Sequence, residues 1–141
     1  MNDNAIISII GRNFDACTGI GMAELVTCGR FYKENDRYVV SYRESELTGM
    51  DGATTVFHIQ PDRVTMLRDG PVHTHLVFER DRKHLSLLDT PEGALPVGVC
   101  AWKVDSGIGD NGGDLTLEYA VEVNHAVTGA NCIHMRVKGE A

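Results

Sequence analysis

Basic residues are scarce in this sequence: 13 Lys and Arg stand against 20 Asp and Glu, which gives a formal net charge of -7. No run of basic residues interrupts this acidic excess. Proteins that bind nucleic acids or anionic membranes need clustered positive charge to neutralise phosphate groups. The composition therefore argues against nucleic acid and anionic membrane surfaces as partners of this chain.

Long apolar runs are also missing. The apolar stretches are a few residues long, whereas a membrane-spanning helix needs roughly 20 consecutive apolar residues. The chain opens with Met1-Asn2-Asp3-Asn4, where a secretory signal would carry Lys or Arg. We therefore expect a cytoplasmic protein without a transmembrane helix.

Cysteine is too sparse to form a disulfide framework. The four cysteines, Cys17, Cys28, Cys100 and Cys132, are widely separated and form no CxxC pair. Small secreted folds that depend on disulfides carry a much denser cysteine pattern. We expect four free thiols.

The remaining composition is that of one ordinary globular domain. The chain has 141 residues, of which 43% are hydrophobic and 23% charged. A chain of this size buries about two thirds of the surface that its unfolded form exposes, so it needs no metal or disulfide to stay folded. We expect a single domain over residues 1–141 with one core.

Strict alternation of apolar and polar residues is the main structural signal. Residues 115–123 alternate in this way, as do residues 133–137, and together they predict a C-terminal hairpin. Further segments are rich in Val, Thr, Tyr and Phe, which favour strands. The ten predicted strands cover residues 5–12, 22–32, 37–47, 53–59, 63–69, 74–80, 83–88, 94–104, 115–123 and 133–138.

Short turn sequences separate these segments. Turn-forming residues occur at Asn35–Asp36, Gln60–Arg63, Asp81–Arg82 and Thr90–Gly93. No window repeats apolar residues at helical spacing over a dozen positions, so we expect no long helix. The pattern predicts an all-β fold, a closed antiparallel meander barrel of eight to ten strands.

Motifs for catalysis and cofactor binding are weak or missing. The stretch Gly107–Gly112 has the GxGxxG spelling, but a strand follows where a dinucleotide site requires a helix, so we expect a hairpin loop and no cofactor. The sequence shows no GxSxG elbow and no legible Ser-His-acid or Cys-His arrangement. An enzyme is therefore the least favoured class.

Two histidines suggest a metal site only weakly. His73 and His75 are two residues apart and share a strand face, so one of His58, His84 or His134 could complete a zinc site with them. Two histidines at this spacing specify neither a third ligand nor its supporting hydrogen bonds. A solvated strand end is the favoured interpretation.

Charged residues in phase with apolar faces are a stronger signal. Met66 and Arg68 share one face of a predicted strand, and Tyr42 and Glu44 share one face of another. If both faces point inward, the barrel holds a cation and a carboxylate, which either pair with each other or anchor a ligand. The candidate ligand-binding residues are Arg68, Glu44, Tyr42, Met66 and, from the C-terminal hairpin, Tyr119.

The order of these segments resembles the YwiB-like family of small bacterial proteins of unknown function. The pieces that carry the resemblance are Thr27-x-Gly29, Tyr42-x-Glu44, Arg68-x-Gly70 and Thr90-Pro91-x-Gly93. The sequence departs from the family where Leu88-Asp89 precedes the last of these turns, a place that commonly holds an aromatic residue. The resemblance implies a calycin-type, lipocalin-like barrel, and it implies no activity, substrate or cofactor.

Two functions follow from this fold. The first is a binding module whose barrel holds one small, partly apolar molecule with the help of Arg68 and Glu44. The alternative is a structural or protein-interaction module with a solid barrel core. An unfilled interior would favour the first function and a tightly packed one the second.

Overall fold

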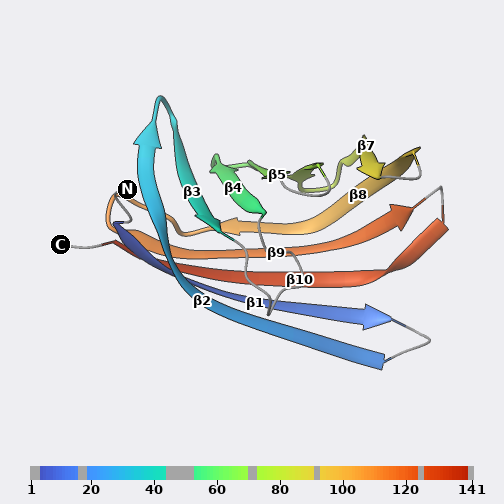
Figure 1. The fold of residues 1–141 in the computed structure, drawn as a ribbon, viewed down its shortest axis with the longest axis horizontal. Helices are drawn as coiled ribbons and strands as arrows, with labels where there is room; N and C mark the ends of the chain where they lie inside the picture. Colours follow the sequence, from blue (N-terminus) through green and yellow to red (C-terminus); the bar gives the residue numbers. More distant parts are fainter. Residues whose placement is uncertain are drawn as a thin grey trace.

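The protein is described by a computed structural model over residues 4–15, 19–43, 53–69, 73–90, 93–123 and 126–139. These residues form ten strands, and none of them forms a helix long and apolar enough to cross a membrane (Figure 1). The strands are β1 (Ala5–Asp15), β2 (Gly19–Glu34), β3 (Arg37–Arg43), β4 (Thr54–Ile59), β5 (Arg63–Asp69), β6 (Thr74–Glu79), β7 (Lys83–Thr90), β8 (Gly93–Ser106), β9 (Gly112–Val123) and β10 (Ala126–Gly139).

All ten strands belong to one antiparallel sheet with the order β6-β5-β4-β3-β2-β1-β10-β9-β8-β7. β1 lies between β2 and β10, and Ala5 is in register with both Gly29 and Gly139. This pairing places the start of β1 beside the end of β10 (Figure 1). The sheet curls into a nearly closed barrel, which confirms the predicted all-β fold and is consistent with a calycin-like barrel.

The barrel closes between β6 and β7 without a regular ladder. Among the described residues, one antiparallel bridge joins Glu79 to Arg82, and Arg80 pairs with Ala101 of β8. The predicted turn at Asp81–Arg82 forms: the Arg82 N–H donates to the Glu79 carbonyl oxygen 3.1 Å away, and φ of Asp81 is 63°. The Asp81 N–H donates instead to the Ala101 carbonyl oxygen of β8, 2.9 Å away. We call the boundary between β6 and β7 the seam.

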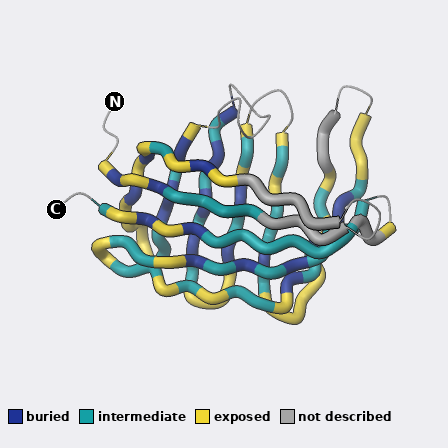
Figure 2. Tube along the Cα trace, turned by 90° about the horizontal axis from the view of Figure 1, so that it is seen from below, coloured by how far each residue is buried: buried dark blue, intermediate teal, exposed yellow. Residues whose placement is uncertain are grey.

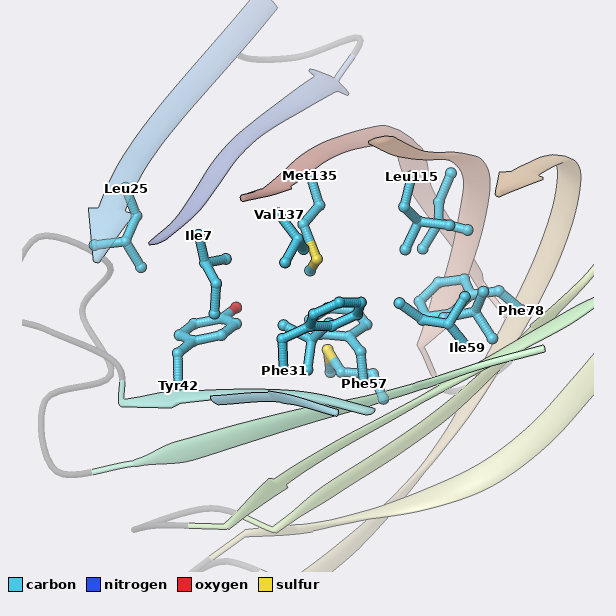
Figure 3. Packing of buried hydrophobic residues seen from close by; sticks show 14 of the residues in the cluster. Ile7, Leu25, Phe31, Tyr42, Phe57, Ile59, Phe78, Leu115, Met135 and Val137 are labelled. Atoms are coloured by element: carbon cyan, nitrogen blue, oxygen red, sulfur yellow. The ribbon is translucent and has the colours of Figure 1, made fainter. Parts of the chain in front are cut away.

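The core results from the period of two along each strand. Thr55, Phe57 and Ile59 of β4 are buried, whereas the residues between them are half-buried, and this alternation recurs around the barrel (Figure 2). Side chains from opposing walls meet in the interior, where Tyr42 faces Ile7 (Figure 3). Burial of each large apolar side chain contributes about 1.5 to 3 kcal/mol.

β2 pairs with two different strands, and Gly29 is the residue at which the two pairings meet. Its first part pairs with β1 and its last part, from Gly29 to Glu34, pairs with β3. A Cβ at Gly29 would overlap the Ile7 side chain and the Ser41 carbonyl oxygen, and would lie 3.2 Å from Cβ of Tyr42. Glycine is therefore required at this corner, where the backbones approach closely.

The C-terminal hairpin and the glycine-rich loop form as predicted. β9 pairs with β10, so that Leu115 lies opposite Met135, and both side chains are fully buried. The GxGxxG stretch connects β8 to β9, and the Gly107 N–H donates to the Asp114 carbonyl 2.7 Å away. Because β9 begins at Gly112, no helix N-terminus is available there for a dinucleotide.

Candidate functional site

A row of polar residues crosses the inner face of four neighbouring strands at one end of the barrel. The register pairs Tyr42 with Thr55, Thr55 with Arg68, and Arg68 with Thr74. Residues directly opposite in register point to the same face of a sheet. Thr55 is fully buried, so the row faces the interior, and we call these four residues the polar row.

Arg68 is held within the polar row by its neighbours. Its Nε donates a hydrogen bond to Oγ1 of Thr55 at 3.0 Å, and its Nη2 lies 4.0 Å from the sulfur of Met66. The side chain is half-buried, and Met66 beside it is buried. The structure thus confirms that Arg68 and Met66 share an inward face.

Tyr119 of β9 brings a buried phenol near this arginine. Burial raises the pKa of Tyr119 to about 12, and the positive charge of Arg68 opposes part of that rise. The ring packs edge-on against Phe78, with 4.7 Å between the ring centroids. Tyr119 therefore stays neutral at physiological pH and contributes an apolar ring and a hydroxyl to the region around Arg68.

Tyr42 occupies the other end of the polar row and packs as a core residue. Its ring stacks on Phe57 with the centroids 6.4 Å apart, and Figure 3 shows it directed from its strand towards Ile7. Tyr42, Met66 and Tyr119 are thus members of the apolar cluster. Their part in ligand binding stays a prediction.

A hollow of about 270 Å³ lies beside Arg68, between the start of β6 and Leu87 of β7. Across the seam, Oγ of Ser86 donates to the His75 carbonyl oxygen at 2.7 Å. We call this space the seam hollow. It is lined by Leu67, Arg68, Asp69, His73, Thr74, His75 and Leu87.

Both histidines of the zinc hypothesis border the seam hollow and face outward. Nδ1 of His73 lies 2.8 Å from Oδ1 of Asp69, and both side chains are exposed. His75 is exposed as well. Within the described ranges, no group of three or more His, Cys, Asp and Glu side chains is placed to hold a metal ion. The zinc hypothesis therefore gains no third ligand there.

A second hollow of about 330 Å³ lies at the opposite end of the seam, against Pro61, Glu79 and Arg80. Oε1 of Glu79 is 2.9 Å from Nε2 of His84 and 3.4 Å from Nη2 of Arg63. The hydrogen bond from His84 is the main cause that lowers the pKa of Glu79. Glu79 thus joins β6 to His84 of β7 and Arg63 of β5 at this end of the seam.

Comparison with known proteins places this barrel in a family. Residues 7–135 match the family described as a domain of unknown function, DUF1934. The chain belongs to this family. Its structure is similar to the crystal structure of the ywiB protein from Bacillus subtilis, with a TM-score of 0.80 and 14% sequence identity over 99% of this chain and 93% of that chain. At this identity the similarity concerns the fold, and it confirms the resemblance seen in the sequence. The chain matches none of the curated proteins.

Several sequence predictions for this DUF1934 protein fall outside the described residues. Glu44 is among them, so its pairing with Arg68 stays a prediction. Cys17 is another, and the four free thiols likewise stay a prediction. Gly70 of the Arg68-x-Gly70 piece also lies outside. The site is therefore built from the polar row and the seam hollow.

Sequence reasoning missed Thr55 and Thr74 as site residues. Both were counted as strand formers, because threonine favours strands and its hydroxyl is compatible with either face. The signal for Thr55 was present, since it is in phase with Phe57 and Ile59 on a buried face. A hydroxyl on such a face needs a hydrogen-bond partner, and Arg68 supplies one.

Proposed function

We propose that this DUF1934 protein binds a small anionic molecule, with a carboxylate or phosphate group placed at Arg68. The observation that carries the proposal is that Arg68 belongs to both the interior polar row and the lining of the seam hollow. A guanidinium presents five N–H donors in a planar fork that matches carboxylate and phosphate oxygens. Its hydrogen bond to Thr55 orients this fork at the polar end of the barrel.

The surroundings of Arg68 favour binding of an anion. Half-burial lowers the effective dielectric around the guanidinium, which strengthens its attraction for a negative group compared with an arginine in open solvent. Leu67 and Leu87 supply apolar walls on the outer side. A hollow of about 270 Å³ lies just below the usual range of ligand pockets, roughly 300 to 1,000 Å³. The ligand is therefore small and partly apolar.

The filled interior limits where a ligand can lie. Phe57, Phe78 and Met135 are buried in the cluster that occupies the described part of the barrel. This packing favours a solid core over a wide central cavity, so the proposed ligand lies at the polar end of the barrel. We assign no reaction to the site, because one arginine defines no bond-making step.

A titration of labelled protein followed by nuclear magnetic resonance tests the proposal, with benzoate and inorganic phosphate as separate probes. We expect saturable shifts of the Arg68 Nε–H and of the Thr55, Thr74 and His75 amides. Arg68→Met should abolish these shifts. Arg63→Met is the matched control, because Arg63 lies on the same strand but is exposed and pairs with Glu79.

Two results would contradict the proposed site. One is the lack of saturable shifts with either anion in the wild-type protein. The other is binding that Arg68→Met leaves intact, since the anion would then lie elsewhere. Native mass spectrometry of freshly purified protein adds an independent reading, because a bound anion appears as a mass increment that Arg68→Met should remove.

A further inference from the structure

The outer surface of β7 carries two exposed leucines at alternate positions. Leu85 and Leu87 are 68% and 62% exposed, and with period two they lie on one face of the strand. β7 is also a terminal strand of the sheet. We call Leu85 and Leu87 the leucine pair. Adjacent exposed leucines on a sheet face are typical of contact surfaces.

The strand next to the leucine pair leaves this surface flat. Leu85 lies opposite Gly98 of β8, which has no side chain, and Cδ2 of Leu85 is within 3.2 Å of the place that a Cβ would occupy there. Lys83 and Glu122 meet across the same glycine, with Nζ 2.6 Å from Oε2. The leucine pair thus adjoins a charged pair of both signs.

The charge distribution favours a second copy of the chain at this face. Two copies that each carry a net charge of -7 repel each other over most of their surfaces. Residues 80–83, directly before the leucine pair, hold three of the 13 basic residues, Arg80, Arg82 and Lys83, beside the acidic Asp81. This segment therefore lacks the acidic excess of the whole chain, which lowers the repulsion between two copies that approach through β7.

We propose that two copies of this chain form a two-fold symmetric dimer through the leucine pair. In such an interface the same patch of each copy contacts the other, so it must be complementary to itself. The apolar leucines meet this condition, and Lys83 and Glu122 meet it because each finds its opposite charge in the other copy. The proposal does not depend on ligand binding, and it is tested on ligand-free protein because Leu87 borders the seam hollow.

Sedimentation equilibrium of the full chain, from about 1 µM to about 1 mM, measures the association. We expect a reversible monomer–dimer equilibrium for the wild type. Leu85→Ser with Leu87→Ser should weaken it by about 100-fold or more, since four leucines lose their contacts in each dimer. Val26→Ser is the control, because Val26 is 62% exposed on β2 and should leave association unchanged. Circular dichroism should show the same fold for all three proteins.

Charge reversal gives a second, independent reading. Lys83→Glu and Glu122→Lys each break the pair within a copy, and each should weaken its own homodimer. A mixture of the two variants places opposite charges together only between copies, so it should form a heterodimer. A wild type that stays monomeric up to about 1 mM would overturn the proposal, as would leucine variants that dimerise normally or a mixture that fails to associate.

Discussion

At the scale of single residues, Gly29 shows how the lack of a side chain enables two strand pairings. The residue is in register with Ala5 of β1 and with Tyr42 of β3. Its position between the Ile7 side chain and the Ser41 carbonyl oxygen leaves no room for a Cβ. The corner at Gly29 therefore depends on glycine for steric reasons.

Gly29→Ala should therefore destabilise the fold by about 3 kcal/mol, at the upper end of the cost of overpacking a core. The backbone oxygen of Ser41 cannot move aside as a flexible side chain can. Gly11→Ala is the matched control on β1, since nothing lies within 4 Å of a Cβ at that position. Urea unfolding of both variants measures the difference, and equal stabilities would contradict the close approach at Gly29.

Tyr119 makes stability depend on pH in the alkaline range. Its folded pKa of about 12 exceeds the value of about 10 in an unfolded chain, so the folded state holds the phenol proton more tightly. The resulting stability is complete below pH 10 and is lost as the pH rises to 12, by about 2 to 3 kcal/mol in all.

Urea unfolding between pH 8 and pH 12 checks this dependence against Tyr119→Phe, which has no phenol proton. Other alkaline groups titrate equally in both proteins, so their effects cancel in the difference. The free-energy advantage of the wild type over the variant should shrink above pH 10. A difference that stays constant with pH would show that Tyr119 is not buried as described.

At the scale of elements, the seam is the weakest boundary in the sheet. Strands elsewhere in the sheet share ladders of six or more residue pairs. Among the described residues, the seam is instead joined by the Glu79–Arg82 bridge, the contact of Glu79 with His84 and the Ser86 hydrogen bond to His75. Local opening follows the free energy of the contacts that hold a segment. We expect the amides of β6 and β7 to exchange with solvent faster than those of β9 and β10.

Ser86→Ala should lower stability by about 1 kcal/mol, the usual net value of one hydrogen bond, and should speed amide exchange in β6 and β7. Ser106→Ala is the control, because the Ser106 hydroxyl accepts a 3.4 Å hydrogen bond from Ile108 in the β8–β9 loop and lies away from the seam. Hydrogen exchange followed by mass spectrometry compares the two. Unchanged exchange at the seam would mean that backbone contacts hold it.

The strands were predictable from the sequence, whereas their neighbours were only partly so. Alternation such as that of residues 115–123 is a local property, and it correctly indicated which side chains face inward. The pairing of β1 with β10 and the absence of a β6–β7 ladder depend on how the whole sheet closes, which no local pattern records. The seam hollow was missed for the same reason, because β5, β6 and β7 meet there only in three dimensions.

At the scale of the whole molecule, β10 holds the barrel together from both sides. Its residues 130–139 pair with β1 along one edge, and its residues 130–138 pair with β9 along the other. Met135 and Val137 on this strand are buried in the core. Without these residues β1 and β9 would both become open edges, and the apolar interior would be exposed to water.

A chain ending at Gly129 should therefore lose cooperative unfolding. A chain ending at Gly139 retains all described residues of β10 and serves as the control. Thermal unfolding followed by circular dichroism compares them, since loss of the core removes the sharp transition. A Gly129 chain that still melts cooperatively near the control temperature would show that β1 and β9 close the barrel by themselves.

Because Ala5 pairs with Gly139, the first and last strands of the chain lie in the middle of the sheet. The edges of the sheet, β6 and β7, are consecutive in the chain and meet at the sparsely bonded seam. If the two ends were joined by a short linker and the backbone were opened at Asp81, the strands would run from β7 through β10 and β1 to β6. Each strand would then pair with the next one along the chain. Such a circular permutant would keep every described strand ladder and would disturb only the Glu79–Arg82 and Arg80–Ala101 bridges among the described pairings. The barrel is in this sense a ring of ten strands, in which the sheet begins and ends at the seam.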